Sequence, residues 1–139
     1  MGRLKNAKAD LLKSIELEPK LSSAYWNIHL IFLLEGEPEE ALHNLEQCMK
    51  CANIIQSIQS FTSTTHDCSA KDNNENLHCA IKCSTMKSYQ LYQDILSSKA
   101  FIYSLLNDSQ MEIETWTKLI NCNPACELAY HKRANLYLK

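Results

Sequence analysis

Hydrophobic residues recur along most of the chain at spacings of three and four, which is the period of an amphipathic α-helix. The first such segment runs over residues 3–19 and is ended by Pro19. A second begins at Ser22 or Ser23, either of which can cap it, and stops at Gly36. The chain therefore opens with two predicted helices separated by a short turn.

Gly36 and Pro38 mark the end of one helix and the immediate start of another. Glycine is favoured just beyond a helix C-terminus, and proline fits the first turn of the next helix. The helix that follows carries Leu45 and Cys48 on one face, and its apolar spacing continues to about residue 61. This pattern predicts two antiparallel helices joined by a tight link.

Residues 62–86 are dominated by polar side chains and contain little that a core could bury. We therefore expect an inserted, exposed loop there. Helical spacing returns by about Lys87 and lasts until Asn107 and Asp108, a pair that favours a break.

Ser109 and Glu112 then form the pattern of a capping box and open another predicted helix, which Pro124 ends. A last helix begins near Cys126. Glycine is scarce, since the chain has only two glycines and three prolines in 139 residues. That scarcity argues against a β-sandwich with frequent tight turns and against a glycine-rich phosphate loop, so we predict an all-α fold.

The helices repeat a pattern. Aligning Pro19 with Pro124 places Leu11 opposite Trp116, and the segments after the two prolines match as well. This pattern resembles the tetratricopeptide repeat, a 34-residue helix-turn-helix unit with small residues at positions 8, 20 and 27 and a proline near position 32.

Three registers of this unit can be placed, with residues 22–55 and 93–126 as repeats and 127–139 as a truncated first helix. Residues 3–19 then supply the second helix of a preceding repeat. Both termini therefore lack a hairpin partner, from which we expect a fragment or short isoform of a longer repeat protein, or self-association through the exposed ends.

The chain departs from the repeat pattern at several positions. His29 occupies position 8 and Glu112 position 20, where small residues are expected, and Asn53 replaces the proline at position 32. The starts at 22 and 93 are two periods plus three residues apart. A degenerate repeat within residues 56–92 is the alternative to an extended second helix with an inserted loop, and the polar centre of that segment favours the loop.

The resemblance implies a right-handed α-solenoid of antiparallel helix pairs that binds a peptide or amphipathic helix of a partner protein in its concave groove. By that resemblance the groove-facing positions are 2, 5, 9 and 12, which are Ser23, Trp26, Leu30, Leu33, Asp94, Ser97, Phe101, Ser104, Leu128, His131 and Asn135. Trp26, Leu30 and Phe101 would form an apolar floor, although Trp26 could instead pack against a neighbouring repeat. Family members that clamp the carboxylate of a chaperone tail have lysine at position 5, where this chain has Trp26 and Ser97.

Charge and cysteine content limit the possible ligands and the cellular compartment. A formal net charge of −2 gives no basic surface for nucleic acid, and the longest strongly apolar run, residues 28–34, is too short to cross a bilayer. Seven cysteines cannot all pair within one chain, and no secretory leader opens the sequence. We therefore expect a cytoplasmic protein in a reducing compartment.

Five residues of the central segment form an alternative site: His66, Cys68, His78, Cys79 and Cys83. They could bind zinc or make the segment a redox-sensitive regulatory module, but their spacing fits no established zinc finger. We expect no metal and no cofactor. Cys48 and Cys51 lie within a predicted helix as core residues, and His29 fits a packed core histidine better than a catalytic base, so we expect no enzymatic activity.

Overall fold

The computed structural model describes residues 2–52 and 75–138, and for residues 75–86 it describes the backbone alone. Within these ranges every regular element is a helix: α1 (Gly2–Leu17), α2 (Ser22–Glu35), α3 (Pro38–Cys51), α5 (Glu75–Leu105), α6 (Ser109–Cys122) and α7 (Glu127–Tyr137). The predicted all-α class is thus confirmed for the described part of the chain. No helix in that part is both long and apolar enough to span a membrane.

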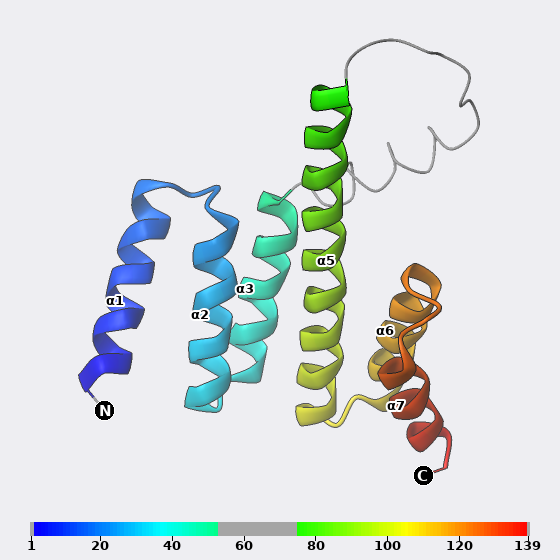
Figure 1. Cartoon of the computed structure of the whole chain (residues 1–139). Coiled ribbons are helices and arrows are strands. Elements are labelled where there is room, and N and C mark those ends of the chain that lie inside the picture. Colours follow the sequence, from blue (N-terminus) through cyan, green and yellow to red (C-terminus); the bar gives the residue numbers. More distant parts are fainter. Residues whose placement is uncertain (1, 53–74, 139) are drawn as a thin grey trace.

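The helices stand side by side in the order of the sequence (Figure 1). Each one packs against the next described helix: α1 on α2, α2 on α3, α3 on α5, α5 on α6 and α6 on α7. Neighbouring helices run in alternate directions, and the two termini lie at opposite ends of the row (Figure 1).

The turn between α2 and α3 follows the sequence closely. Gly36 adopts a left-handed conformation with φ of 79°. Its N–H donates to the Leu33 carbonyl at 3.2 Å, and the N–H of Glu37 donates to the Phe32 carbonyl at 2.9 Å. This is a Schellman motif, which satisfies two carbonyls at the end of α2 before Pro38 begins α3.

The turn between α5 and α6 repeats this motif with asparagine in place of glycine. Asn107 has φ of 57°, and its N–H donates to the Ser104 carbonyl while the N–H of Asp108 donates to the Tyr103 carbonyl. Asparagine is among the few residues other than glycine that tolerate this conformation. The predicted break at Asn107 and Asp108 is therefore confirmed.

Two predicted caps differ from the structure. Asp108, rather than Ser109, caps α6, since its carboxylate accepts a hydrogen bond of 3.0 Å from the N–H of Met111. Glu112 turns inward and is buried, so the capping box does not form. At the start of α2 the cap is Leu21, with no side-chain hydrogen bond, and Ser22 is already the first helical residue.

The central segment also differs from the prediction. Residues 75–86, predicted as part of a polar loop, are helical and form the first part of the 31-residue α5. The polar composition indicated a lack of core residues, but extending a helix that is already formed costs far less than starting a new one. α3 ends at Cys51 rather than near residue 61. The remainder of the predicted loop and of the predicted extension, residues 53–74, lies outside the described residues.

Two clusters of buried side chains hold the row together. The first core cluster joins α3 to α5 and consists of Ala41, Leu45, Cys48, Ile95 and Ile102. The second core cluster joins α5, α6 and α7 and consists of Leu96, Ala100, Trp116, Leu119, Ile120 and Ala129. α5 therefore contributes one face to each cluster.

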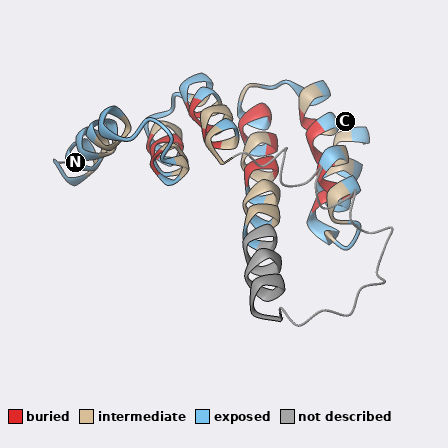
Figure 2. Cartoon of the chain, turned by 90° about the horizontal axis from the view of Figure 1, so that it is seen from above, coloured by how far each residue is buried: buried red, intermediate tan, exposed pale blue. Residues whose placement is uncertain are grey.

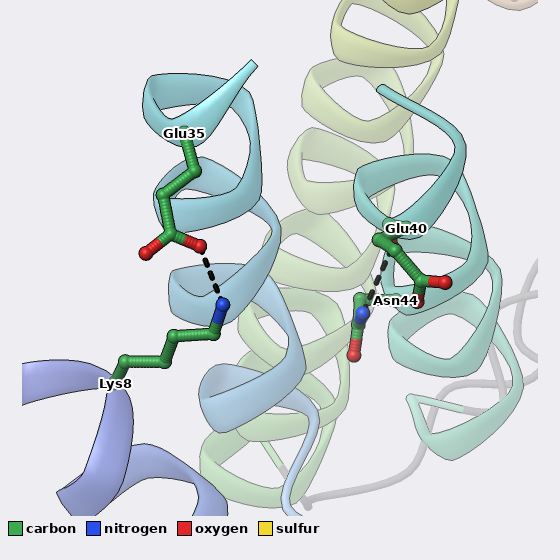
Figure 3. A network of polar contacts seen from close by, with 4 residues as sticks. All are labelled: Lys8, Glu35, Glu40 and Asn44. Carbon is green, nitrogen blue, oxygen red and sulfur yellow. Dashed lines mark hydrogen bonds and ion pairs between the residues drawn. The ribbon is translucent and has the colours of Figure 1, made fainter. Parts of the chain in front are cut away.

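α1 is attached much less firmly. It has no buried residue, and only exposed and partly buried residues are seen on it in Figure 2. The Lys8 ammonium forms an ion pair with Glu35 of α2 (Figure 3) and lies 4.0 Å from the centroid of the Phe32 ring. Because partly exposed ion pairs contribute little to stability, the contact of α1 with α2 is weak.

His29 is completely buried in α2, which confirms its assignment as a core histidine. Its Nδ1 is hydrogen-bonded to the Trp26 carbonyl, whereas its Nε2 has no partner among the described atoms. Burial lowers the pKa of the imidazole, and the hydrogen bond to Trp26 opposes that shift only in part. The folded protein therefore disfavours the protonated ring.

We predict that Gly36→Ala lowers the free energy of unfolding by about 1 kcal/mol. A Cβ at Gly36 would meet no atom within 4 Å, so the cost comes from the left-handed backbone and not from a clash. Asparagine already occupies the equivalent turn, so Gly36→Asn should cost less than Gly36→Ala. Urea unfolding of the three proteins measures the difference, and equal stability of all three would contradict the prediction.

We also predict that stability falls below about pH 6.5, the ordinary pKa of histidine in an unfolded chain. Above that pH neither state is protonated at His29, and the contribution of the neutral ring is fully present. Below it the unfolded chain binds a proton that the folded chain excludes, which lowers the free energy of unfolding by at most about 1.4 kcal/mol per pH unit.

Urea unfolding at about pH 7.5 and about pH 5.5 measures this slope. His29→Ala, which removes the buried ring, should reduce the slope. The same slope in wild type and His29→Ala would contradict the assignment.

Candidate binding face

α2, the second half of α5 and α7 share one pattern of buried and open positions. Counted from residues 22, 93 and 127, position 3 is Ala24, Ile95 and Ala129, and all three are buried. The eleven residues at the predicted groove positions are not buried. Those that are exposed are Ser23, Leu30, Asp94, Phe101, Ser104, Leu128, His131 and Asn135, and those that are partly buried are Trp26, Leu33 and Ser97.

Trp26 and Leu33 lie at the boundary between α2 and its neighbours. Both pack against the first core cluster, to which α5 contributes Ile95 and Ile102. The Trp26 ring also lies against the His29 ring, with centroids 4.6 Å apart. Part of the Trp26 surface therefore packs inside the molecule, and the rest remains accessible.

Two further apolar residues extend the predicted face. Leu34 follows Leu30 by one helical turn, and Leu105 follows Phe101 by the same spacing. Their exposed fractions are 41% for Leu30, 74% for Leu34, 54% for Phe101 and 48% for Leu105. We call these four residues the apolar stripe. Leu34 and Leu105 are not among the groove positions of the tetratricopeptide repeat. Their spacing of four from Leu30 and Phe101 is the sequence signal that could have identified them.

The polar residues of this face can donate and accept hydrogen bonds, and two of them already do so within their own helix. Asp94 accepts a hydrogen bond of 3.0 Å from the Gln90 amide, and His131 lies 3.5 Å from the Asn135 amide nitrogen. The eleven residues include no lysine and no arginine. The groove positions are therefore mainly apolar on α2, whereas polar residues outnumber apolar ones at those on α5 and α7.

A shallow hollow of about 170 Å³ lies between α3, α5 and α6, lined among others by Met49, Tyr92 and Met111. The Lys99 ammonium forms an ion pair of 2.9 Å with Glu46 beside it. Sequence reasoning did not indicate this hollow. Pockets for drug-sized ligands measure about 300–1,000 Å³, so this one is too small to hold such a molecule.

Two of the described cysteines, Cys48 and Cys122, are disfavoured as thiolates. Burial, together with the neighbouring Cys51, raises the pKa of the Cys48 thiol to about 11, so almost none of it is thiolate at neutral pH. Burial also raises the pKa of Cys122. Cys51 donates a hydrogen bond of 3.5 Å to the Pro19 carbonyl.

The predicted alternative site cannot be located as a set of side chains. His66 and Cys68 lie outside the described residues, and for His78, Cys79 and Cys83 the structure gives only the helical backbone of α5. Among the side chains that the structure does describe, no group of three or more histidine, cysteine, aspartate or glutamate residues could hold a metal ion.

No protein-family model matches the chain, and no curated protein matches it either. The likeness to the tetratricopeptide repeat therefore rests on the residues of the chain.

Proposed function

We propose that the chain is a right-handed α-solenoid of tetratricopeptide type, a protein-interaction scaffold without a reaction of its own. Its concave face, formed by α2, α5 and α7, binds a peptide or helix of a partner protein. The exposure of the four residues of the apolar stripe, two on α2 and two on α5, is the observation that carries this proposal. The repeated Schellman turn at Gly36 and Asn107, both at position 15 of their repeats, supports the repeat architecture.

The composition of α2 explains why its open face favours a partner. Its sequence, SSAYWNIHLIFLLE, is apolar on nearly every side, and a helix of that kind is normally buried all round. In this structure Leu30 and Leu34 remain open to solvent. Covering apolar surface is worth roughly 25 cal/mol per Å², so a partner that covers the stripe gains binding energy on helices that are already in place.

The chemistry of the face indicates the kind of partner. The apolar stripe suits the apolar side of an amphipathic helix or of an extended segment. Ser97 and Ser104 lie four residues before and three residues after Phe101, and their hydroxyl groups can hydrogen-bond to the same partner. A ligand held by its terminal carboxylate would need basic residues. None occurs at the eleven groove positions, which speaks against a carboxylate clamp of the chaperone-binding kind.

The experiment uses a double substitution in the stripe, Leu30→Asp with Phe101→Asp. The matched control, Leu12→Asp with Leu17→Asp, makes the same chemical change at two exposed leucines of α1. A crosslinking pulldown with the wild type first identifies a partner, and calorimetry then measures its affinity for each purified protein. We expect the stripe variant to bind at least about tenfold more weakly, which corresponds to about 1.4 kcal/mol.

The control variant should bind as the wild type does, and circular dichroism should show the same helix content in all three proteins. Unchanged affinity of a folded stripe variant would show that the partner binds elsewhere, and the proposal would then be wrong.

A further inference from the structure

The shallow hollow between α3, α5 and α6 lies where the two core clusters meet. Leu45 and Ile95 of the first cluster and Leu96 of the second all line it. Because the lining residues come from all three helices, a group placed in the hollow would contact each of them. No residue of the apolar stripe lines it. The hollow is therefore a feature separate from the proposed groove.

The hollow and the apolar stripe lie on different sides of α5. Tyr92, Ile95 and Lys99 line the hollow, and their spacing of three and four places them on one side of the helix. Phe101 lies two residues after Lys99, which is a rotation of about 200° around the helix axis. A partner in the groove and a group in the hollow can therefore be bound at the same time.

The hollow has the size of one ring-shaped side chain. Its volume of about 170 Å³ is close to that of an engineered protein cavity of about 150 Å³ that binds benzene. The apolar lining residues are Leu45, Met49, Ile95, Leu96 and Met111. One aromatic ring therefore fits the hollow both in size and in polarity, although a drug-sized molecule does not.

The lining favours an aromatic ring over an aliphatic side chain. Met49 of α3 and Met111 of α6 both line the hollow, and thioether sulfur makes favourable contacts with aromatic rings. Methionine is also flexible enough to fit around a group of irregular shape. Thr115 lines the hollow too, but its hydroxyl already donates to the Met111 carbonyl at 2.7 Å. This hydroxyl therefore requires no polar ligand.

The charged residues that line the hollow carry a net positive charge. Lys99 and Lys118 line it together with one acid, Glu46, which is paired with Lys99 at 2.9 Å. Lys118 is exposed and forms no ion pair within the part of the chain that the structure describes. Glu114, one turn before Lys118, accepts a hydrogen bond of 3.1 Å from Gln110. A carboxylate of a partner can therefore pair with Lys118.

We propose that this hollow is a second binding site, which holds one phenylalanine ring of an acidic segment of a partner protein. The ring contacts Met49 and Met111, and a carboxylate next to it in the partner sequence pairs with Lys118. Because the ring contacts both core clusters, its binding also stabilises the fold. The proposal uses neither the repeat register nor the apolar stripe, so it is independent of the proposed function.

Nuclear magnetic resonance of the full chain with isotope-labelled methionine methyl groups tests this site. The probe is the blocked pentapeptide Asp-Glu-Phe-Glu-Asp. The ring current of the bound phenylalanine should shift the methyl signals of Met49 and Met111, which the variants Met49→Leu and Met111→Leu assign. The same peptide with alanine in place of phenylalanine should shift neither signal. A peptide with lysine in place of the acids should bind at least about threefold more weakly.

Lys118→Glu reverses the charge beside the hollow at an exposed position. It should weaken binding of the acidic peptide at least about threefold and strengthen binding of the lysine peptide. The matched control, Lys132→Glu, makes the same change at an exposed lysine of α7 that does not line the hollow, and it should bind both peptides as the wild type does. Thr115→Phe fills the hollow from within the chain and should abolish binding.

Methyl signals that stay in place with the acidic peptide would overturn the inference, as would equal binding of the alanine peptide. If Lys118→Glu binds the acidic peptide as tightly as the wild type, the acidic class of partner is wrong. Circular dichroism checks the fold of Thr115→Phe, and the peptide comparisons decide the question if this variant does not fold. The Leu30→Asp and Phe101→Asp double variant should bind the peptide normally, so a failure of groove binding and a failure of this site are recognised separately.

Discussion

The packing of α5 on two sides is the constraint on which the rest of the structure depends. Ile95 and Ile102 enter the first core cluster, while Leu96 and Ala100 enter the second. Adjacent residues of a helix point about 100° apart, so one helix can serve both clusters only if apolar residues occupy two neighbouring arcs of its surface. Any movement of α5 removes packing from both halves at once, and the position of α2 relative to α7 is fixed through this single helix.

The same arrangement explains why α2 and α5 keep an apolar face in contact with solvent. A helix packed on two sides still has part of its circumference in water, and in α2 and α5 that part carries the apolar stripe and its flanking serines. Because the core clusters fix the backbone of α5, the stripe is preorganised and a partner need not order it. The structural demand for two core faces thus leaves a third face open to solvent, and this is the face where we propose that a partner binds.

Features that single residues determine could be predicted from the sequence, whereas features that depend on the surrounding structure could not. The turns at Gly36 and Asn107 follow from residues that tolerate a positive φ, and both were predicted. The cap at Asp108 was assigned to Ser109 instead, because the choice between adjacent cap residues depends on the direction in which the backbone enters the helix. The start of α5 at Glu75 was missed since hydrophobic spacing detects a buried face and not a helix as such. The spacing of Leu34 and Leu105 indicates an apolar face. Spacing alone, however, does not tell whether another helix covers that face or leaves it open to solvent.

The weak packing of α1 on α2 affects how the chain unfolds. A helix without buried side chains gains little from tertiary packing, and an isolated helix of its length is only marginally stable in water. We therefore expect local unfolding of α1 at a free energy well below that of the core around α5, with fast amide hydrogen exchange as its signature. The contacts of the Lys8 ammonium with Glu35 and with the Phe32 ring would then be lost before the core clusters open.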